Sequence, residues 1–166
     1  MIKNLEHLIL SGNFTEAEKL YQIVDFQQFE DEIIISAYDN RNILYYTFLH
    51  YLIKKKETVE LHNLAFSLFV HALTPIEGAY HCALYHAQRA VELTNEHDSD
   101  ILEHLLFLHE VPDKLVSDEK AHETCHEILA LDPANKYAKE TLKKLAKKKK
   151  KKISLKAIQR MAKKKF

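Results

Sequence analysis

The sequence predicts an all-α protein, and three observations support this prediction. The chain holds only two glycines and three prolines among 166 residues, so few positions interrupt a helix. Leucine, alanine, glutamate and lysine are abundant, as in helical proteins. Apolar residues recur at the spacing of one helical face along most of the chain. One β-branched run, 33–35, fits a strand by itself, but a lone strand has no partner, so we expect a helix there.

Apolar periodicity divides the chain into successive helices with short breaks between them. The expected helices are, in chain order, Met1–Leu10, a helix that opens at Phe14, Asp25–Tyr38, Asn42–Lys54, Thr58–Leu73, Thr74–Leu93, Asp100–His109, Ser117–Leu131, a helix around Tyr137–Leu145, and a short amphipathic helix over 153–166.

Local residues mark several of these helix ends. Gly12 follows the first helix, where a glycine commonly ends a helix. Pro75 fits the first turn of the sixth helix, since proline needs no hydrogen-bond acceptor there. Asp98 or Ser99 and Ser117 are suitable N-caps. The pair Asp132-Pro133 ends a helix, because proline cannot donate a hydrogen bond and disfavours helical geometry in the preceding residue.

Several segments resemble the tetratricopeptide repeat family of helical-repeat proteins. SGNFTEAEKLYQIV places Gly12, Ala17 and Tyr21 at positions where that family has its turn glycine, small residue and aromatic residue. AHETCHEILALDPAN, which begins at Ala121, matches the end of a repeat, with Cys125 and Ile128 as departures, and AYHCALYHAQRAVELTN is similar. Aligning Ala83 of one segment with Ala121 of the other gives an offset of 38 residues, longer than the family's repeat of about 34. The resemblance implies antiparallel helix pairs stacked as an α-solenoid that binds proteins or peptides.

Charge divides the chain into two parts. Residues 143–166 hold 13 of the 24 lysines and arginines and no acidic residue. Residues 1–142 therefore hold 11 basic and 24 acidic residues, a net charge of −13. We expect an acidic helical domain over 1–142 and a lysine-rich tail over 143–166, helical where a counter-charge is near. The tail suggests nucleic acid or an anionic membrane surface as an alternative partner.

A possible metal motif lies inside one predicted helix. His122, Glu123 and His126 match the H-E-x-x-H pattern of zinc peptidases, in which two histidines hold zinc and the glutamate activates water. A non-catalytic zinc site is also open, because Cys82 and His86 have the same one-turn spacing as His122 and His126. Packing is the simpler explanation of these helices, so we expect no cofactor and keep zinc as the alternative.

These observations favour a non-catalytic protein-binding module with an acidic surface and a basic protein partner. A dedicated inhibitor of a basic toxin or nuclease, similar in role to immunity proteins, is one concrete form of this expectation. The expected partner-facing residues are Asp98, Asp100, Glu103 and Glu110, acidic side chains along one apolar helix. The second hypothesis is a zinc hydrolase that uses the histidine motif. Cys82 and Cys125 lie in helical patterns, where we expect small buried residues and no disulfide framework. This cysteine usage and the lack of a signal peptide or transmembrane segment favour the cytoplasm.

Overall fold

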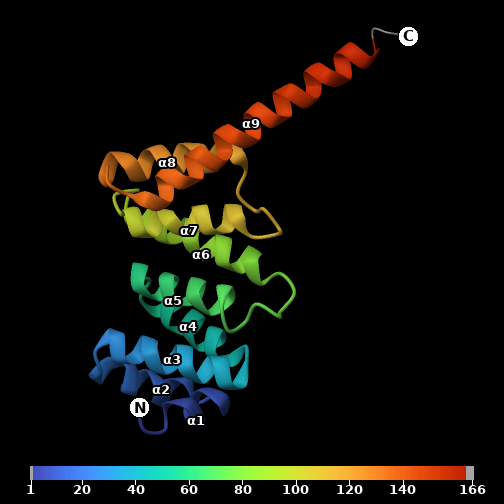
Figure 1. Ribbon diagram of the computed structural model, residues 1–166. Helices are drawn as coiled ribbons and strands as arrows, with labels where there is room; N and C mark the ends of the chain where they lie inside the picture. Colours follow the sequence, from blue (N-terminus) through green and yellow to red (C-terminus); the bar gives the residue numbers. More distant parts are fainter. Residues whose placement is uncertain (1, 164–166) are drawn as a thin grey trace. The chain divides into compact units, whose positions relative to one another are not determined.

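The computed structural model describes the backbone of residues 2–163 and the side chains of residues 2–151. Its described part is all-helical, and neighbouring helices pack against one another (Figure 1). The nine helices of this part are α1 (Leu5–Leu10), α2 (Phe14–Ile23), α3 (Phe26–Asn40), α4 (Leu44–Lys55), α5 (Val59–Val70), α6 (Ala79–Leu93), α7 (Ser99–Glu110), α8 (Asp118–Leu131) and α9 (Lys136–Lys163). The chain forms two compact units, Met1–Glu96 and His97–Phe166.

The first unit contains α1–α6, and its core is rich in aromatic side chains. Phe29 of α3 and Phe48 of α4 are fully buried and lie edge to face, with ring centroids 6.2 Å apart. Tyr21 of α2 packs on Phe29 at 4.8 Å, beside the buried Ala17. Because Ala17 is small, α2 approaches its neighbours closely at that position. The large ring of Tyr21 fills the space one helical turn further along.

Helix α3 settles the ambiguous isoleucine run in favour of a helix. The Asp25 side chain accepts a hydrogen bond from the Gln28 backbone amide and caps the helix at its start. The run then divides by helical position: Ile33 is buried, Ile34 is half-buried and Ile35 is 63% exposed. The prediction of a helix is confirmed, and the run becomes part core and part surface.

The start of α6 differs from the sequence prediction. The helix was expected to begin at Thr74-Pro75, but residues 71–78 form turns and α6 begins at Ala79. Gly78 has a φ of +81°, a left-handed backbone conformation that residues other than glycine rarely adopt. This glycine ends the turn segment, so the proline marks a turn and not a first helical turn.

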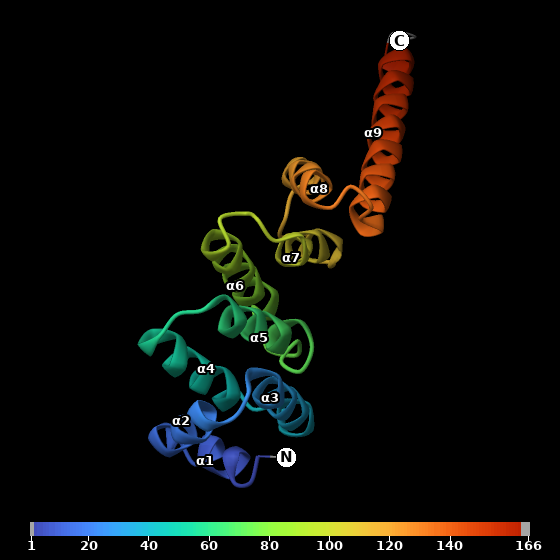
Figure 2. The same ribbon diagram turned by 90° about the vertical axis from the view of Figure 1, so that its left-hand side faces the viewer.

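The second unit contains α7, α8 and the packed part of α9. The Asp98 side chain accepts from the backbone amides of Asp100 and Ile101, and the Ser117 hydroxyl accepts from Lys120, which confirms both N-cap predictions. Helix α9 packs on α7 and α8 through its first turns, and its later part extends away from them (Figures 1 and 2). The boundary predicted between residues 142 and 143 falls inside this continuous helix.

The first lysines of the lysine-rich run pair with counter-charges, and the helix continues beyond them to Lys163. Lys144 Nζ lies 2.7 Å from a carboxylate oxygen of Glu110, and Lys148 Nζ lies 2.6 Å from one of Asp118. These contacts offset the repulsion between lysines one turn apart. The amphipathic pattern expected over 153–166 lies outside the described side chains.

Candidate functional site

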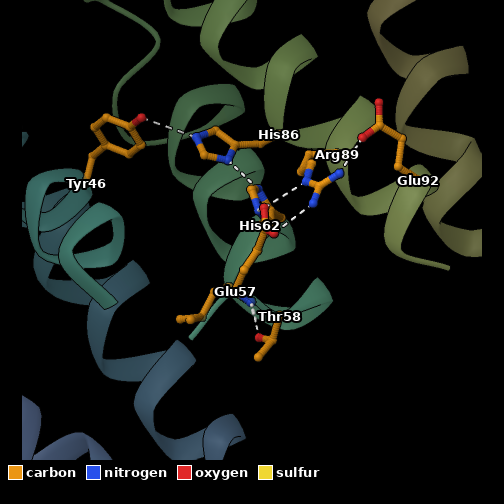
Figure 3. A network of polar contacts seen from close by, with 8 residues as sticks. Tyr46, Glu57, Thr58, His62, His86, Arg89 and Glu92 are labelled. Atoms are coloured by element: carbon orange, nitrogen blue, oxygen red, sulfur yellow. Dashed lines mark hydrogen bonds and ion pairs between the residues drawn. The ribbon is translucent and has the colours of Figure 1, made fainter. Parts of the chain in front are cut away.

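Two buried histidines face each other between α5 and α6 (Figure 3). His62 of α5 is 0% exposed and His86 of α6 is 1% exposed, and their Nδ1 atoms lie 2.8 Å apart. Alanines on either side of His86 allow the two helices to approach closely. A histidine pair inside such an interface needs hydrogen bonds on every ring nitrogen, because an unpaired buried polar group destabilises the fold.

The structure supplies these partners as one continuous chain of hydrogen bonds. His62 Nε2 lies 3.0 Å from Glu57 Oε1, and His86 Nε2 lies 3.4 Å from the Tyr46 hydroxyl. The Arg89 guanidinium donates two hydrogen bonds of 2.8 Å to the Glu57 carboxylate. Figure 3 shows the chain running from Tyr46 through both histidines to Glu57, Arg89 and Glu92.

The proton positions follow from the carboxylate at one end of this chain. An ionised carboxylate only accepts hydrogen bonds, so His62 carries its proton on Nε2 and accepts at Nδ1. His86 then donates from Nδ1 to His62 and accepts at Nε2 from the Tyr46 hydroxyl. One neutral tautomer of each histidine therefore satisfies all four ring nitrogens.

Burial keeps both histidines neutral near pH 7. It lowers the pKa of His86 to about 3, with a smaller contribution from the neighbouring His62 and His50. Burial also lowers the pKa of His62, although the Glu57 carboxylate acts in the opposite direction. Hydrogen bonds from Arg89 and His62 hold the pKa of Glu57 at about 2. The network is thus a neutral pair tied to a surface ion pair, and protonating both histidines would set two N–H groups against each other.

Sequence reasoning found only half of this pair. His86 was singled out as a possible zinc ligand, and His62 was not singled out. The available sequence pattern was a histidine at a buried position of an otherwise apolar helix, which calls for a polar partner. Nothing in the sequence named His86 as that partner, because the pairing depends on how α5 and α6 are rotated toward each other.

The predicted zinc ligands belong to two separate units, Cys82 and His86 to the first and His122 and His126 to the second. His122 and His126 are exposed on α8 with ring centroids 4.7 Å apart, and Glu123 is exposed beside Lys120. Cys82 is exposed, contrary to the expectation of a small buried residue, and His86 is bonded to His62. Over the described residues, no group of three or more histidine, cysteine, aspartate or glutamate side chains is placed to hold a metal ion.

Three of the four expected partner-facing acids make contacts within the second unit. Asp98 caps α7, and Glu103 accepts a 2.7 Å hydrogen bond from the Asn135 side chain. The Glu110 carboxylate accepts hydrogen bonds from the Tyr137 hydroxyl and the Lys144 ammonium group. Asp100 is exposed in the first turn of α7. Glu103 and Glu110 therefore hold α7 to the start of α9, whether or not they also face a partner.

A surface hollow lies between α3 and α5 in the first unit. Its volume is about 340 Å³, and its lining residues are Glu30, Asp31, Ile34, Ile35, Ser67 and His71. Next to it the Tyr38 ring, 49% exposed, lies 6.5 Å from the His71 ring. The cap and helix 25–40 contain five acidic residues and no basic one: Asp25, Glu30, Asp31, Glu32 and Asp39. Apolar and acidic side chains are thus combined on one helix surface.

Comparison with known proteins adds no relative to this description. No family model, no curated protein and no solved structure matches the chain. Within the described residues, none of the helices combines the length and the hydropathy that crossing a membrane requires.

Proposed function

We propose that this protein is a non-catalytic protein-interaction module that binds a basic protein partner. The observation that carries the proposal is the outer surface of α3, where Ile35 is 63% exposed and Tyr38 is 49% exposed beside Glu30 and Asp31. Exposed isoleucines and tyrosines next to a hollow are typical of binding surfaces, which combine a few apolar anchors with a charged rim.

Charge gives this surface its selectivity. Residues 1–142 carry a net charge of −13, and residues 25–40, which include α3, contain five acidic residues and no basic one. An acidic surface attracts basic partners over distances of about a Debye length and repels acidic ones. Apolar contacts at Ile34 and Ile35 then supply affinity that salt does not screen.

The fold supports the proposal through the way its helices are paired. Within each unit, helices that are two apart in the chain contact each other. The contacting pairs are α2 with α4, α3 with α5, and α7 with α9. Stacked helix pairs produce such contacts, so we extend the resemblance to tetratricopeptide repeats and propose an α-solenoid within each unit. Proteins of this architecture bind other proteins along their helix surfaces.

A dedicated inhibitor is the concrete form of this function that we favour. An acidic surface that covers a basic active site neutralises a nuclease or toxin without any chemistry of its own. The cytoplasm, where a cell protects its own nucleic acid, is the compartment that this role implies.

The test is affinity capture with the full-length chain from its native cell, followed by rebinding of each captured protein in purified form. The double variant Asp31→Lys with Ile35→Asp alters only exposed side chains of the α3 surface. Glu119→Lys is the matched control, because Glu119 is an exposed acid on α8. We expect a basic protein that binds the wild type and the control and binds the double variant at least about tenfold more weakly. Equal binding by all three proteins would refute the assignment to α3.

A further inference from the structure

The lysine-rich part of α9 is anchored to α7 and α8 at its base, and its backbone extends away from these two helices further along. Ala138 and Leu145 are buried, and Lys144 and Lys148 pair with Glu110 and Asp118. The helix then continues to Lys163, and in both views it extends away from α7 and α8 (Figures 1 and 2). Among the residues whose side chains are described, the acids of α7 and α8 therefore pair with Lys144 and Lys148 at the beginning of the lysine-rich run.

The sequence beyond this anchor combines positive charge with apolar residues. Lysines 149–151 are exposed. In the segment 153–166, ISLKAIQRMAKKKF, the spacing of Leu155, Ile158 and Ala162 matches one helical face, and five lysines or arginines stand at the other positions. A basic helix with one apolar stripe lowers its free energy by docking on a surface that is both acidic and apolar.

The hollow between α3 and α5 has the complementary composition. Glu30 and Asp31 line it together with Ile34 and Ile35, and no lysine or arginine is among its lining residues. The two parts of the chain also carry opposite net charges of equal size, −13 over residues 1–142 and +13 over residues 143–166. One copy of the chain therefore contains both halves of a complementary pair.

We propose that the C-terminal segment 149–166 of one copy docks in the α3–α5 hollow of a second copy. This inference rests on the proposed function, because it places a partner on the same surface. Two copies that exchange their segments form a closed pair in which both hollows are filled. Self-association then occupies the surface that binds the basic partner, and a partner must displace the segment to bind.

The test is sedimentation velocity on the full-length protein over a range of concentrations, with two complementary variants. The hollow variant is Asp31→Lys with Ile35→Asp, and the segment variant is Leu155→Asp with Ile158→Asp. We expect the wild type and the Glu119→Lys control to dimerise, with a dissociation constant that rises at least about tenfold between about 0.05 M and 0.5 M salt. Each double variant alone should remain monomeric at concentrations where the wild type is dimeric.

A mixture of the two variants separates docking between copies from docking within one copy. The hollow variant contributes an intact segment and the segment variant an intact hollow, so the mixture should form a one-to-one complex. Monomers throughout the mixture would overturn the proposal, as would a wild type that is monomeric at every concentration. Association that nuclease treatment abolishes would assign the segment to nucleic acid and also overturn it.

The two proposals fail in different ways. If the segment variant is monomeric and still captures the basic partner, both the function and the self-association are supported. If the proteins dimerise as expected and no basic partner binds the purified chain, the interaction-module function fails and the docking site remains.

Discussion

Acid should destabilise the first unit through His86, and the structure sets the size of the effect. The folded state holds the pKa of His86 at about 3, against 6.5 for a free histidine. Between pH 6.5 and about 3, His86 is protonated in the unfolded chain and neutral in the folded chain. The free energy of unfolding therefore has its full value above pH 6.5 and falls as the pH drops toward 3. The slope is about 1.4 kcal/mol per pH unit, which gives a loss of about 2 kcal/mol by about pH 5.

The perturbation that isolates this effect is His86→Gln. Glutamine is close to histidine in size and does not titrate, so its stability should not carry the His86 slope between about pH 6.5 and pH 5. The variant should also lose about 1–3 kcal/mol near pH 7, because Tyr46 or His62 loses a hydrogen-bond partner.

The assay is urea unfolding followed by circular dichroism at several pH values, for the wild type, His86→Gln and the control His126→Gln. His126 is exposed on α8, so the control removes a histidine without opening the buried network. The titrating groups that the proteins share, including the half-buried His104, cancel in the difference between wild type and His86→Gln. An equal slope for wild type and His86→Gln between pH 6.5 and 5 would refute the reasoning.

Three further predictions concern caps, turns and thiols. Asp98→Ala removes both side-chain hydrogen bonds that start α7 and should cost about 1 kcal/mol in urea unfolding, whereas an unchanged midpoint would show that another group caps the helix. Gly78→Ala should cost about 1 kcal/mol in the same measurement, because the strain comes from its positive φ and no atom lies within 4 Å of the added carbon; a stabilised variant would contradict this. With a thiol reagent, the exposed Cys82 should react in the native protein, and Cys125 should react only after unfolding, because burial excludes the reagent and raises its pKa to about 11. Two rapidly reacting thiols in the native state would disprove the last prediction.

The histidine pair also affects the register and rotation in which α5 and α6 pack against each other. An apolar interface tolerates small rotations and shifts, because hydrophobic contact has no direction. A chain of hydrogen bonds from Tyr46 to Glu57 is satisfied in one register only, since a shift of either helix leaves ring nitrogens unpaired. We expect the histidine pair to fix the register of the two helices as well as to stabilise the fold. The pH dependence of stability follows from the burial of the same two side chains.

The sequence by itself determined where the helices lie and how several of them begin. Helical periodicity, the Asp98 and Ser117 caps and the break at Asp132-Pro133 depend on residues close together in the chain, so they can be read locally. Ala121, Cys125 and Ile128, which belong to a segment that resembles a repeat, are buried on α8. Local reasoning failed at the start of α6, where a proline fits either a first helical turn or a loop and the left-handed Gly78 decided for the loop.

Only the tertiary structure decided which side chains meet. The pairing of His62 with His86, the exposure of Ile35 beside the buried Ile33, and the contacts of Glu103 and Glu110 with α9 and its cap all join residues that are distant in sequence or set by helix rotation. A helical period gives the face on which a residue lies, but the rotation and the neighbours of that face depend on the packing of the whole unit. For this reason the helices could be predicted, whereas the buried network and the acidic hollow could not.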